Sequence, residues 1–538
     1  MNRQGRILVV DDLEKWREQL VETLQRGGFH ADSAASTKEV LERLNESFYH
    51  LLLLDIRLID PDPSNQEGID LLEELEKRGL SEAVKVIILS AYGTQDQMHT
   101  AFKNHRVADF LSKDKFSGKV LLESVQQIFE KEVKVNLALE IYWQQVKGPE
   151  QVVYNLEIGG MRIRRNAAAL EQIGLELDDL LCRLFHRAKS ILMRPLASGK
   201  SATGVLWAKP FYSSGGARTV AVKFGDFRKI EEEYNNFKEY VEPFVGGGRS
   251  TAVRDIERTF HIGGIIYTFL GADGDQLEDF EVFYQHADVP QIQAVLDDLF
   301  LNTCSAWYAN VGQLQPHNLT LEYQNLLAFT PGKLEHALGE LQKYVQGRQR
   351  LTFKNLHREQ TFTNPLLGIT SPPFVSPTYT CTTHGDFNRH NLLVDANNHT
   401  WLIDFQSVGR GHILRDVAQL DSEIRFFLLL PDNATLDERL EMEEALCSIE
   451  RFSQVQQLVS AFVTENPALE KAYAVIAHLR SLASKLVAQN PGDDISEYYI
   501  ALFYNAINTI RFYSLPAIQR EHALLSASLL ADRLGLKG

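Results

Sequence analysis

The stretch RILVVDD at residues 6–12 decides the fold of the first part of the chain. Four apolar residues precede two aspartates, a pattern that predicts a short buried strand ending in carboxylates. Four further strands are predicted at FHADSA (29–34), YHLLLLDI (49–56), VKVIILSA (84–91) and DFLSK (109–113). Because helical patterns separate these runs, the sequence predicts a doubly wound α/β domain with five parallel strands.

Carboxylates stand at the ends of two of these strands. Asp11 and Asp12 close the first strand, and Asp55 closes the third. The carboxyl ends of parallel strands meet at one edge of a sheet, so these three side chains are expected to lie close together. They would repel one another unless a divalent cation lay among them, and a site of oxygen ligands suits Mg²⁺.

A hydroxyl and an amine complete this predicted edge. Ser90 ends the fourth strand and Lys113 follows the fifth. An aspartate beside bound Mg²⁺ can attack a phosphoryl group while a lysine neutralises the charge on the transferred oxygens. A serine hydroxyl nearby can donate a hydrogen bond to one of those oxygens. The arrangement therefore favours a phosphoryl acceptor site.

Residues 5–130 resemble the receiver domain of bacterial two-component response regulators, since VVDD, LLLLDI, LSA and SK occur in the same order at the same strand ends. The resemblance implies a phosphoacceptor, Asp55; Mg²⁺ ligands, Asp11, Asp12 and Asp55; and switch residues, Ser90, Lys113 and the rotating aromatic Phe110. It also implies a phosphorelay in which a cognate histidine kinase or phosphotransfer protein is the partner. Pairing of two receivers into a homodimer is one further option.

Two positions depart from the receiver pattern. Asp114 follows the lysine where the family usually has proline, so the cis peptide expected there should be absent. The loop after Asp55, RLIDPDPSNQEG (57–68), is longer than usual and carries additional acids. A receiver-like fold that no longer accepts phosphate therefore stays open as an alternative.

A second set of polar residues lies in HGDFNRHN (384–391), followed by LIDF. Phosphoryl transfer from ATP needs a carboxylate that orients the acceptor hydroxyl and oxygen ligands for Mg²⁺ that bridges the ATP phosphates. Asp386 fits the first role, and Asn391 with Asp404 fits the second. His384 is expected to brace the loop.

Upstream, the run AVK places Lys223 in a predicted strand, where it could neutralise ATP phosphates. The helix that follows carries Glu231, Glu232 and Glu233, one of which could hold this lysine. We favour Glu233 because apolar-spaced aromatic residues follow it directly.

The segment SGKSATG (198–204) contains Gly199 and Gly204 between two predicted strands. It lacks the spacing of the kinase glycine-rich loop and of the P-loop. We interpret it as a phosphate-covering loop, with a plain turn as the alternative.

Residues 190 to about 430 resemble the aminoglycoside phosphotransferase and choline kinase branch of the protein-kinase-like fold, through the HGDxxxxN and IDF motifs. The resemblance implies an α+β bilobal domain that binds ATP and Mg²⁺ and transfers phosphate to a protein or small-molecule hydroxyl. The alternative is a catalytically inactive pseudokinase that binds nucleotide and serves as a scaffold in a signalling or conflict-system complex.

The predicted organisation follows from these two resemblances. The expected parts are a receiver domain (1–130), a helical connector (131–189), a kinase-like N-lobe (190–271), a kinase-like C-lobe with the catalytic loop (272–433) and a C-terminal helical extension (434–538). The last helix of the receiver domain is expected to run on from Lys119 to about Trp143 as a semi-rigid connector.

Composition excludes several other classes of protein. The 538 residues carry a formal net charge of −16, which argues against bulk affinity for nucleic acid. The four cysteines lie far apart and form no CxxC pair, so neither a disulfide scaffold nor a zinc site is expected. No stretch has the roughly 18 apolar residues needed to span a bilayer. We therefore expect a cytoplasmic bacterial protein without a membrane partner.

Overall fold

The computed structural model describes residues 3–58, 67–81, 83–90, 107–196, 203–215, 218–244, 250–270, 277–327, 339–341, 345, 348–357, 360–369 and 371–536. The chain divides into two compact units. The first comprises residues 1–234 and 253–268, and the second comprises residues 235–252 and 269–538.

The N-terminal α/β domain contains a five-stranded parallel sheet, as predicted. Its strands run in the order β2-β1-β3-β4-β5. Their bounds are β1 (Arg6–Val10), β2 (His30–Ala34), β3 (Leu51–Leu54), β4 (Lys85–Ser90) and β5 (Asp109–Ser112). The described helices are α1 (Glu14–Arg26), α2 (Thr37–Glu46), α3 (Glu67–Lys77) and α5 (Gly118–Ile128).

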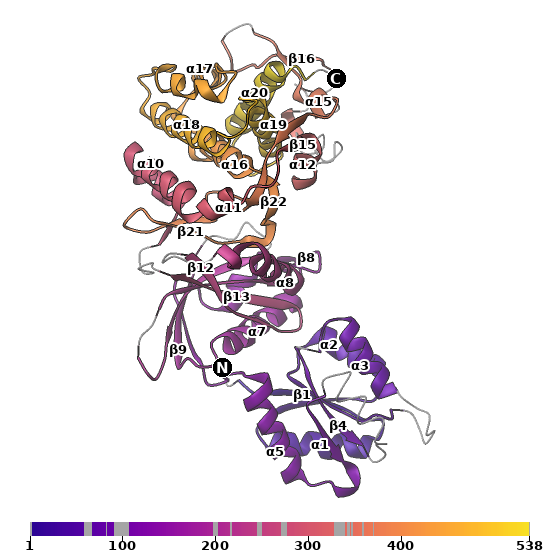
Figure 1. Ribbon diagram of the computed structural model, residues 1–538. Helices are drawn as coiled ribbons and strands as arrows, with labels where there is room; N and C mark the ends of the chain where they lie inside the picture. Colours follow the sequence, from indigo (N-terminus) through magenta and orange to yellow (C-terminus); the bar gives the residue numbers. More distant parts are fainter. Residues whose placement is uncertain are drawn as a thin grey trace. The chain divides into compact units, whose positions relative to one another are not determined.

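Both faces of this sheet are apolar because its strands alternate two sets of buried residues. In β1, Ile7 and Val9 pack with α1 and α5, whereas Leu8 and Val10 pack with α2 and α3. Figure 1 shows α2 and α3 on one side of the sheet and α1 and α5 on the other. The sheet is therefore doubly wound, and its carboxyl-end edge remains accessible to polar side chains.

The expected long helix from Lys119 to Trp143 is wrong. Helix α5 ends at Ile128, a π-helical turn follows (Phe129–Val133), and Glu140–Trp143 forms strand β6. The run EIYW alternates exposed and partly buried residues, and Ile141 and Trp143 pack on the core of the next sheet. This period of two, together with pairing to a neighbouring strand, overrides the helical spacing seen in the longer window.

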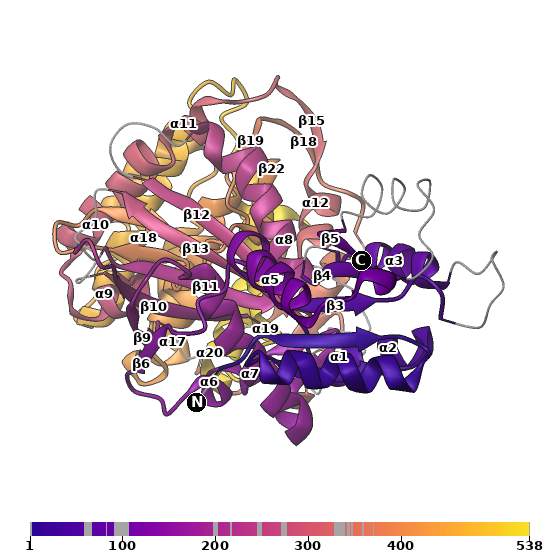
Figure 2. The same cartoon turned by 90° about the horizontal axis from the view of Figure 1, so that it is seen from below.

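The segment 131–189, expected as a helical connector, contains strands as well as helices. After β6 come α6 (Pro149–Val153), β7 (Glu157–Ile158), β8 (Met161–Arg162) and α7 (Ala167–Leu184). Strand β6 joins a six-stranded sheet in the order β12-β13-β11-β10-β9-β6, and Figure 2 shows the strands in this order. The other strands are β9 (Ser190–Pro195), β10 (Gly204–Phe211), β11 (Val220–Asp226), β12 (Ser250–Arg258) and β13 (Ile262–Leu270).

Helix α7 covers one face of the six-stranded sheet. Leu177, Leu180 and Leu184 belong to the same buried core as Val222 and Ile266 of the sheet. The helix bearing the three glutamates, α8 (Phe227–Asn236), follows β11 directly, as predicted.

The second unit is built mainly of helices around short strand pairs. Its first helices are α9 (Phe280–His286), α10 (Val289–Asp298), α11 (Ser305–Ala309), α12 (Leu319–Leu326) and α15 (Pro365–Ile369). Its short strands are β14 (Glu278–Asp279), β15 (Gln315–Asn318), β16 (Arg350–Leu351), β17 (Phe362–Thr363), β18 (Val375–Thr378), β19 (Thr380–Thr383), β20 (Leu392–Val394), β21 (Thr400–Leu402) and β22 (Gly409–His412). The antiparallel pair β20–β21 holds the loop 384–391 close to the segment that contains Asp404, since the two motifs flank these strands.

The C-terminal helices are α16 (Arg415–Glu423), α17 (Leu436–Leu446), α18 (Pro467–Leu486), α19 (Ser496–Ile510) and α20 (Ala517–Leu534). Helices α18 and α19 pack directly on α16, so the expected extension shares a core with the segment after Asp404. That core includes buried charges: Arg425 and His522 both contact Glu443, at 3.1 and 2.8 Å. No helix in the described part of the chain is both long and apolar enough to cross a bilayer.

Candidate functional sites

Three carboxylates meet at the carboxyl-end edge of the five-stranded sheet. Ligand oxygens of Asp11, Asp12 and Asp55 all lie within 4.8 Å of one another. Asp11 follows β1 and Asp55 follows β3, and these strands are hydrogen-bonded neighbours, which explains why residues distant in sequence converge. The oxygen donors and their spacing fit a Mg²⁺ ion.

Lys113 lies inside this carboxylate cluster. Its Nζ is 2.5 Å from Asp11 Oδ2 and also donates to Asp55 Oδ2, and the residue is buried. Burial acts to lower the pKa of Lys113, but the hydrogen bonds that it donates to the two aspartates raise it above its usual value. Burial raises the pKa of Asp11, against the opposing effect of Lys113. A charged lysine therefore contacts the carboxylate that the sequence predicts as phosphoacceptor.

The remaining predicted residues of this site lie on the adjacent strands. Ser90 is the buried last residue of β4, and it pairs in register with Ser112, the residue before Lys113. Phe110 lies on β5 opposite Ile88 and is partly buried against the core. The peptide between Lys113 and Asp114 is trans, as expected from the missing proline.

Helix α7 contacts the N-terminal domain through two consecutive aspartates. Arg3 Nη2 donates to Asp178 Oδ1 at 2.8 Å. His50 Nδ1 accepts from the backbone N–H of Arg6, so Nε2 donates to Asp179 Oδ1 at 2.7 Å. His50 directly precedes β3, the strand that ends at Asp55, so this strand is fixed to α7 at its opposite end.

Lys223 forms the expected ion pair with Glu233. The distance from Lys223 Nζ to Glu233 Oε2 is 2.6 Å, and each side chain is 1% exposed. Lys223 lies on β11 between Val205 of β10 and Ile265 of β13, and the hydroxyl of Tyr267 also donates to Glu233. Glu233, rather than its two neighbours, is the buried glutamate of α8.

Of the two glycines predicted to contact nucleotide, the structure describes one. Gly199 lies outside the described residues. Gly204 begins β10, where an added Cβ would lie 2.3 Å from the ring of Phe224. Close packing therefore explains the glycine at position 204 without reference to a ligand, and nucleotide contact there stays a prediction.

Asp416 of α16 holds the loop 384–391 in place through hydrogen bonds to its backbone. This carboxylate accepts hydrogen bonds from the backbone N–H groups of His384 and Gly385, at 2.8 and 2.9 Å. His384 donates from Nε2 to Ile403 O at 3.1 Å, and its ring stacks on Phe387. Burial lowers the pKa of His384, so the ring is neutral and braces the loop, as expected.

Asp386 is oriented by two amide side chains. Asn391 Nδ2 donates to the Asp386 backbone oxygen at 2.9 Å and to Oδ2 at 3.3 Å. Gln419 Nε2 donates to Oδ1 at 3.0 Å. Both carboxylate oxygens of Asp386 therefore have an amide donor, which fixes the direction of the group.

Asp404 has left-handed backbone angles, φ 70° and ψ 70°, which are uncommon for a residue with a side chain. The residue before it, Ile403, donates from its backbone to Asn391 O at 3.1 Å, which brings the two predicted Mg²⁺ ligands to adjacent segments. The next residue, Phe405, packs against the rings of His384 and Phe237. The constrained backbone thus separates a buried aromatic residue from a partly exposed carboxylate.

Asp416, Gln419 and Arg415 were not predicted from the sequence. All three lie on α16, which follows the motif LIDF and strand β22. A signal was available, since Asp416 is an acid placed among the apolar residues of RDVAQL, and buried acids need partners. The partners themselves, backbone N–H groups in the loop 384–391, cannot be read from side-chain patterns.

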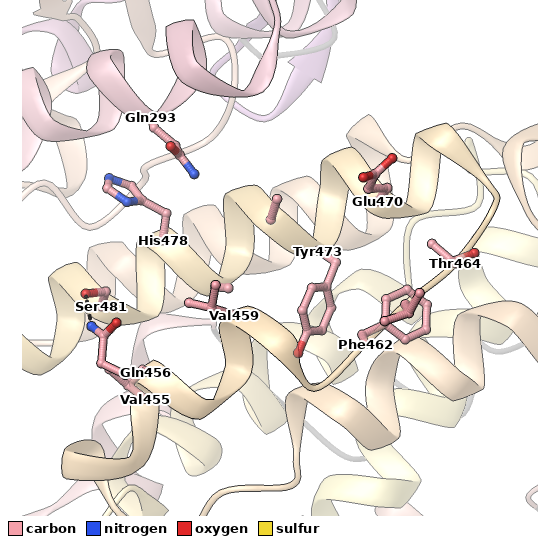
Figure 3. A pocket seen from close by; sticks show the side chains of 13 residues that line it. Gln293, Val455, Gln456, Val459, Phe462, Thr464, Glu470, Tyr473, His478 and Ser481 are labelled. Atoms are coloured by element: carbon pink, nitrogen blue, oxygen red, sulfur yellow. Dashed lines mark hydrogen bonds between the residues drawn. The ribbon is translucent and has the colours of Figure 1, made fainter.

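A hollow of about 370 Å³ lies between α18 and the 3₁₀ segment Phe452–Ser460 (Figure 3). None of the residues predicted from the sequence lines it. Its polar groups bond to their own neighbours: Gln456 donates to Ser481 Oγ, and His478 contacts Asp297. Its apolar rim is exposed, with Val463 at 92%.

Comparison with known protein families gives two matches. Residues 7–126 match the response regulator receiver domain. Residues 188–348 and 361–511 match a family described as ternary complex associated domain 9. The first match covers the carboxylate cluster, and the second covers Lys223 and the loop 384–391.

The curated relatives resemble only the N-terminal domain. Response regulator RR06 of Streptococcus pneumoniae is 32% identical over 104 residues, which are 19% of this chain and 44% of the relative. The phosphate regulon transcriptional regulatory protein PhoB of Escherichia coli is 28% identical over 126 residues, 23% of this chain and 52% of the relative. The chain thus spans about half the length of the curated relatives it matches. A CheY-like receiver domain protein from Methanospirillum hungatei is 27% identical, with a TM-score of 0.22, covering 24% of this chain and 98% of that structure.

Proposed function

The chain belongs to the family described as ternary complex associated domain 9 and begins with a response regulator receiver domain, and from this premise we propose that phosphorylation of Asp55 controls an ATP-dependent phosphotransferase in the second part of the chain. Receiver domains act in phosphorelay signalling, bind Mg²⁺ at their acidic cluster and interact with histidine kinases or phosphotransfer proteins. The finer assignments below are proposals.

In the proposed receiver reaction, Asp55 attacks the phosphoryl group of a phosphohistidine on the partner. The new bond joins phosphorus to an Asp55 oxygen, the phosphorus–nitrogen bond breaks, and the partner histidine is regenerated. Lys113 then moves its contact from the Asp55 carboxylate to the phosphoryl oxygens, with Ser90 as a second donor. Mg²⁺ held by Asp11, Asp12 and Asp55 would supply positive charge to the same oxygens.

The contact between α7 and the receiver supports a route for control. His50 and Asp179 are buried and bonded at 2.7 Å, and Asp179 also accepts from Arg183 at 2.8 Å. A buried charged network is costly to leave partly unpaired, so it favours one arrangement of the receiver against α7. Because α7 also packs on the sheet that carries Lys223, a change in this arrangement reaches the proposed nucleotide site.

In the proposed transferase reaction, Asp386 accepts the proton of an acceptor hydroxyl as the hydroxyl oxygen bonds to the γ-phosphorus of ATP. The bond from γ-phosphorus to its bridging oxygen breaks and ADP leaves. Lys223, held by Glu233, would neutralise the ATP phosphates, and Asn391 with Asp404 would hold Mg²⁺. The observation that carries this proposal is the fixed direction of Asp386, whose two oxygens accept from Asn391 and Gln419.

A nucleotide-binding scaffold is the second candidate. The family description names a ternary complex, which favours a role in assembly. In this case the same residues would hold nucleotide, and the bound state would decide which partners associate. Pairing of two receivers would be one route to such an assembly.

Incubation with γ-labelled ATP and a lysate of the host tests the two candidates against each other. We expect wild-type protein to label a protein or a small molecule, and Asp386→Ala to bind ATP without transferring label. Glu465→Ala, an exposed substitution elsewhere in the second unit, serves as the control and should leave transfer unchanged. Binding of ATP by the wild type without any labelled product would favour the scaffold.

A further inference from the structure

A hollow of about 280 Å³ lies beside Asp386, and we call it the Asp386 hollow. It is lined by Tyr323, Leu326, Leu327, Gly385, Asp386, Ser407, Arg415, Gln419, Asn505, Asn508 and Arg511. All of these residues belong to the second unit, so the hollow is formed within that unit. Among the described residues, its ionisable groups are one carboxylate and two guanidinium groups, together with the neutral phenol of Tyr323, whose pKa burial raises well above its usual value.

Arg415 forms one wall and is almost completely buried, at 7% exposure. Its three hydrogen-bond partners in the described part of the chain are neutral oxygens: Thr383 Oγ1 at 3.3 Å, Gly385 O at 3.1 Å and Ser407 O at 3.4 Å. Its Nε has no hydrogen-bond partner among these residues. Gly385, with φ 79°, permits this position, because an added Cβ would lie 2.0 Å from Arg415 Nη2.

A guanidinium that is removed from water and bonded only to neutral oxygens retains most of its attraction for an anion. Arg415 is therefore a positive charge that the surrounding residues do not neutralise by direct ion pairing. Buried carboxylates such as Asp416 lie behind the loop 384–391, where they bond to backbone N–H groups. They do not line the hollow.

Asn508 and Arg511 line the hollow from the C-terminal end of α19. Arg511 is half-buried, and this burial lowers its pKa. The amide of Asn508 has a buried oxygen that accepts no hydrogen bond from the described residues. A buried amide without a partner is uncommon and indicates a position where a ligand or water bonds.

We propose that the Asp386 hollow binds the phosphoryl acceptor, and that the acceptor is a small hydroxyl compound carrying a carboxylate or phosphate. Its hydroxyl lies at Asp386, and its anionic group lies between Arg415 and Arg511, with the Asn508 amide as a further partner. This inference rests on the proposed transferase function for the identity of the reacting group. The basic wall distinguishes it from a site for cationic acceptors, which two guanidinium groups would repel.

The size of the hollow supports a small ligand. Pockets for small molecules typically enclose roughly 300–1,000 Å³, so about 280 Å³ suits a compound of a few carbons. Asp386, Arg415 and Arg511 line the same hollow, so one ligand could place a hydroxyl at the acid and an anionic group at the arginines.

A matched series of three-carbon probes tests the proposal on the full chain. The probes are glycerate, glycerol 3-phosphate, glycerol and 3-amino-1,2-propanediol, which share hydroxyl groups and differ in charge. Binding is measured by calorimetry in the presence of Mg²⁺ and a non-hydrolysable ATP analogue, so that the readout does not depend on turnover. We expect the two anions to bind roughly tenfold or more tightly than glycerol, and the amine to bind most weakly.

Substitutions at Arg511 locate the binding. Arg511→Gln should remove roughly tenfold of the affinity for both anions, and Arg511→Lys should restore part of it. Arg451→Gln, which removes an exposed charge at another part of the second unit, should leave binding unchanged. Preserved melting temperatures confirm that the variants fold.

The possible outcomes separate the two proposals. Selective anion binding without transfer of label from ATP would support the hollow as a site for small hydroxyl anions and count against the transferase, and with it against the role of the bound anion as acceptor. Equal binding of all four probes, preference for the amine, or no binding of any probe would overturn the hollow as an anionic acceptor site. Labelling of an acidic protein in place of the small anions would also overturn it.

Discussion

Lys113 and Lys223 are the two buried lysines among the described residues of the first unit, and their ion-pair partners differ in kind. Lys113 contacts Asp11 and Asp55, the same carboxylates that would hold Mg²⁺ and accept phosphate. Lys223 contacts Glu233, a residue with no proposed part in bond making. The candidate receiver site therefore lies at one edge of one sheet. Lys223 and Glu233 lie on two successive elements of the same unit, β11 and α8.

The proposed reactions give the two lysines different parts. In the proposed receiver reaction, Lys113 would exchange a carboxylate partner for the phosphoryl oxygens, because Asp55 is itself modified. Lys223 keeps one partner, so its ion pair serves to hold the amine in place. Substitutions in the two pairs should accordingly have different consequences.

Asp55→Asn gives the largest expected effect. The amide is a far weaker nucleophile than the carboxylate, so covalent phosphorylation by acetyl phosphate with Mg²⁺ should fall below detection. Intact-mass spectrometry provides the measurement. Asp70→Asn, an exposed position on α3, is the control and should be modified as the wild type is. Equal modification of Asp55→Asn and the wild type would refute the phosphoacceptor assignment.

Lys223→Met should have two separable effects. Loss of the amine leaves Glu233 buried without its cation, which costs about 3–5 kcal/mol of folding free energy. Loss of the phosphate contact should also weaken ATP·Mg²⁺ binding by roughly tenfold or more. Urea unfolding and calorimetric titration measure the two quantities.

The double variant Lys223→Met with Glu233→Met distinguishes the two effects. Replacing both charges by apolar groups should recover most of the lost stability, because no uncompensated charge remains. ATP binding should stay weak. Recovery of ATP binding in the double variant would show that Lys223 acts only through the fold.

The smallest expected effect concerns a buried charged cluster outside both sites. Burial lowers the pKa of His522 to about 4, although Glu443 opposes this. Between its usual value near 6.5 and 4, the unfolded chain binds a proton that the folded chain does not, so stability falls as the pH decreases through this range. The loss of folding free energy that His522 causes should reach ~3 kcal/mol at pH 4 and stop increasing below that pH.

Urea unfolding of the second unit at pH 7 and pH 4 measures this dependence. His522→Gln should flatten it, and the exposed His357→Gln should not. Neither substitution should change ATP binding. A change in ATP binding in His522→Gln would mean that the cluster, although remote in its contacts, belongs to the functional machinery.

The receiver fold and its candidate site could be predicted from the sequence because the ends of the parallel strands determine which residues lie at one edge of the sheet. Five apolar runs and the residues that close them determine which side chains meet at one edge. For the second candidate site the motifs predicted individual residues, and the ion pair Lys223–Glu233 formed as expected, whereas the role of the site stays a prediction. Asp416, Gln419 and Arg415 were missed because they act through contacts with backbone atoms and through a loop geometry that Gly385 alone permits.

The error at Glu140–Trp143 has a similar origin. Twenty-five residues of helical spacing concealed four residues of alternation, and only the presence of a neighbouring strand decided between them. A local sequence pattern specifies an element poorly when the element depends on pairing with a strand elsewhere in the chain.

Strand β6 and helix α7 limit how this protein can be divided into fragments. A fragment that begins after α7 would lose an edge strand and the helix that covers one face of the six-stranded sheet, and would expose that face to solvent. Likewise, an exchanged receiver would need a histidine before its third strand and an arginine near its start to meet Asp179 and Asp178. The receiver domain and helix α7 are therefore matched by specific contacts, which an exchanged receiver would have to reproduce.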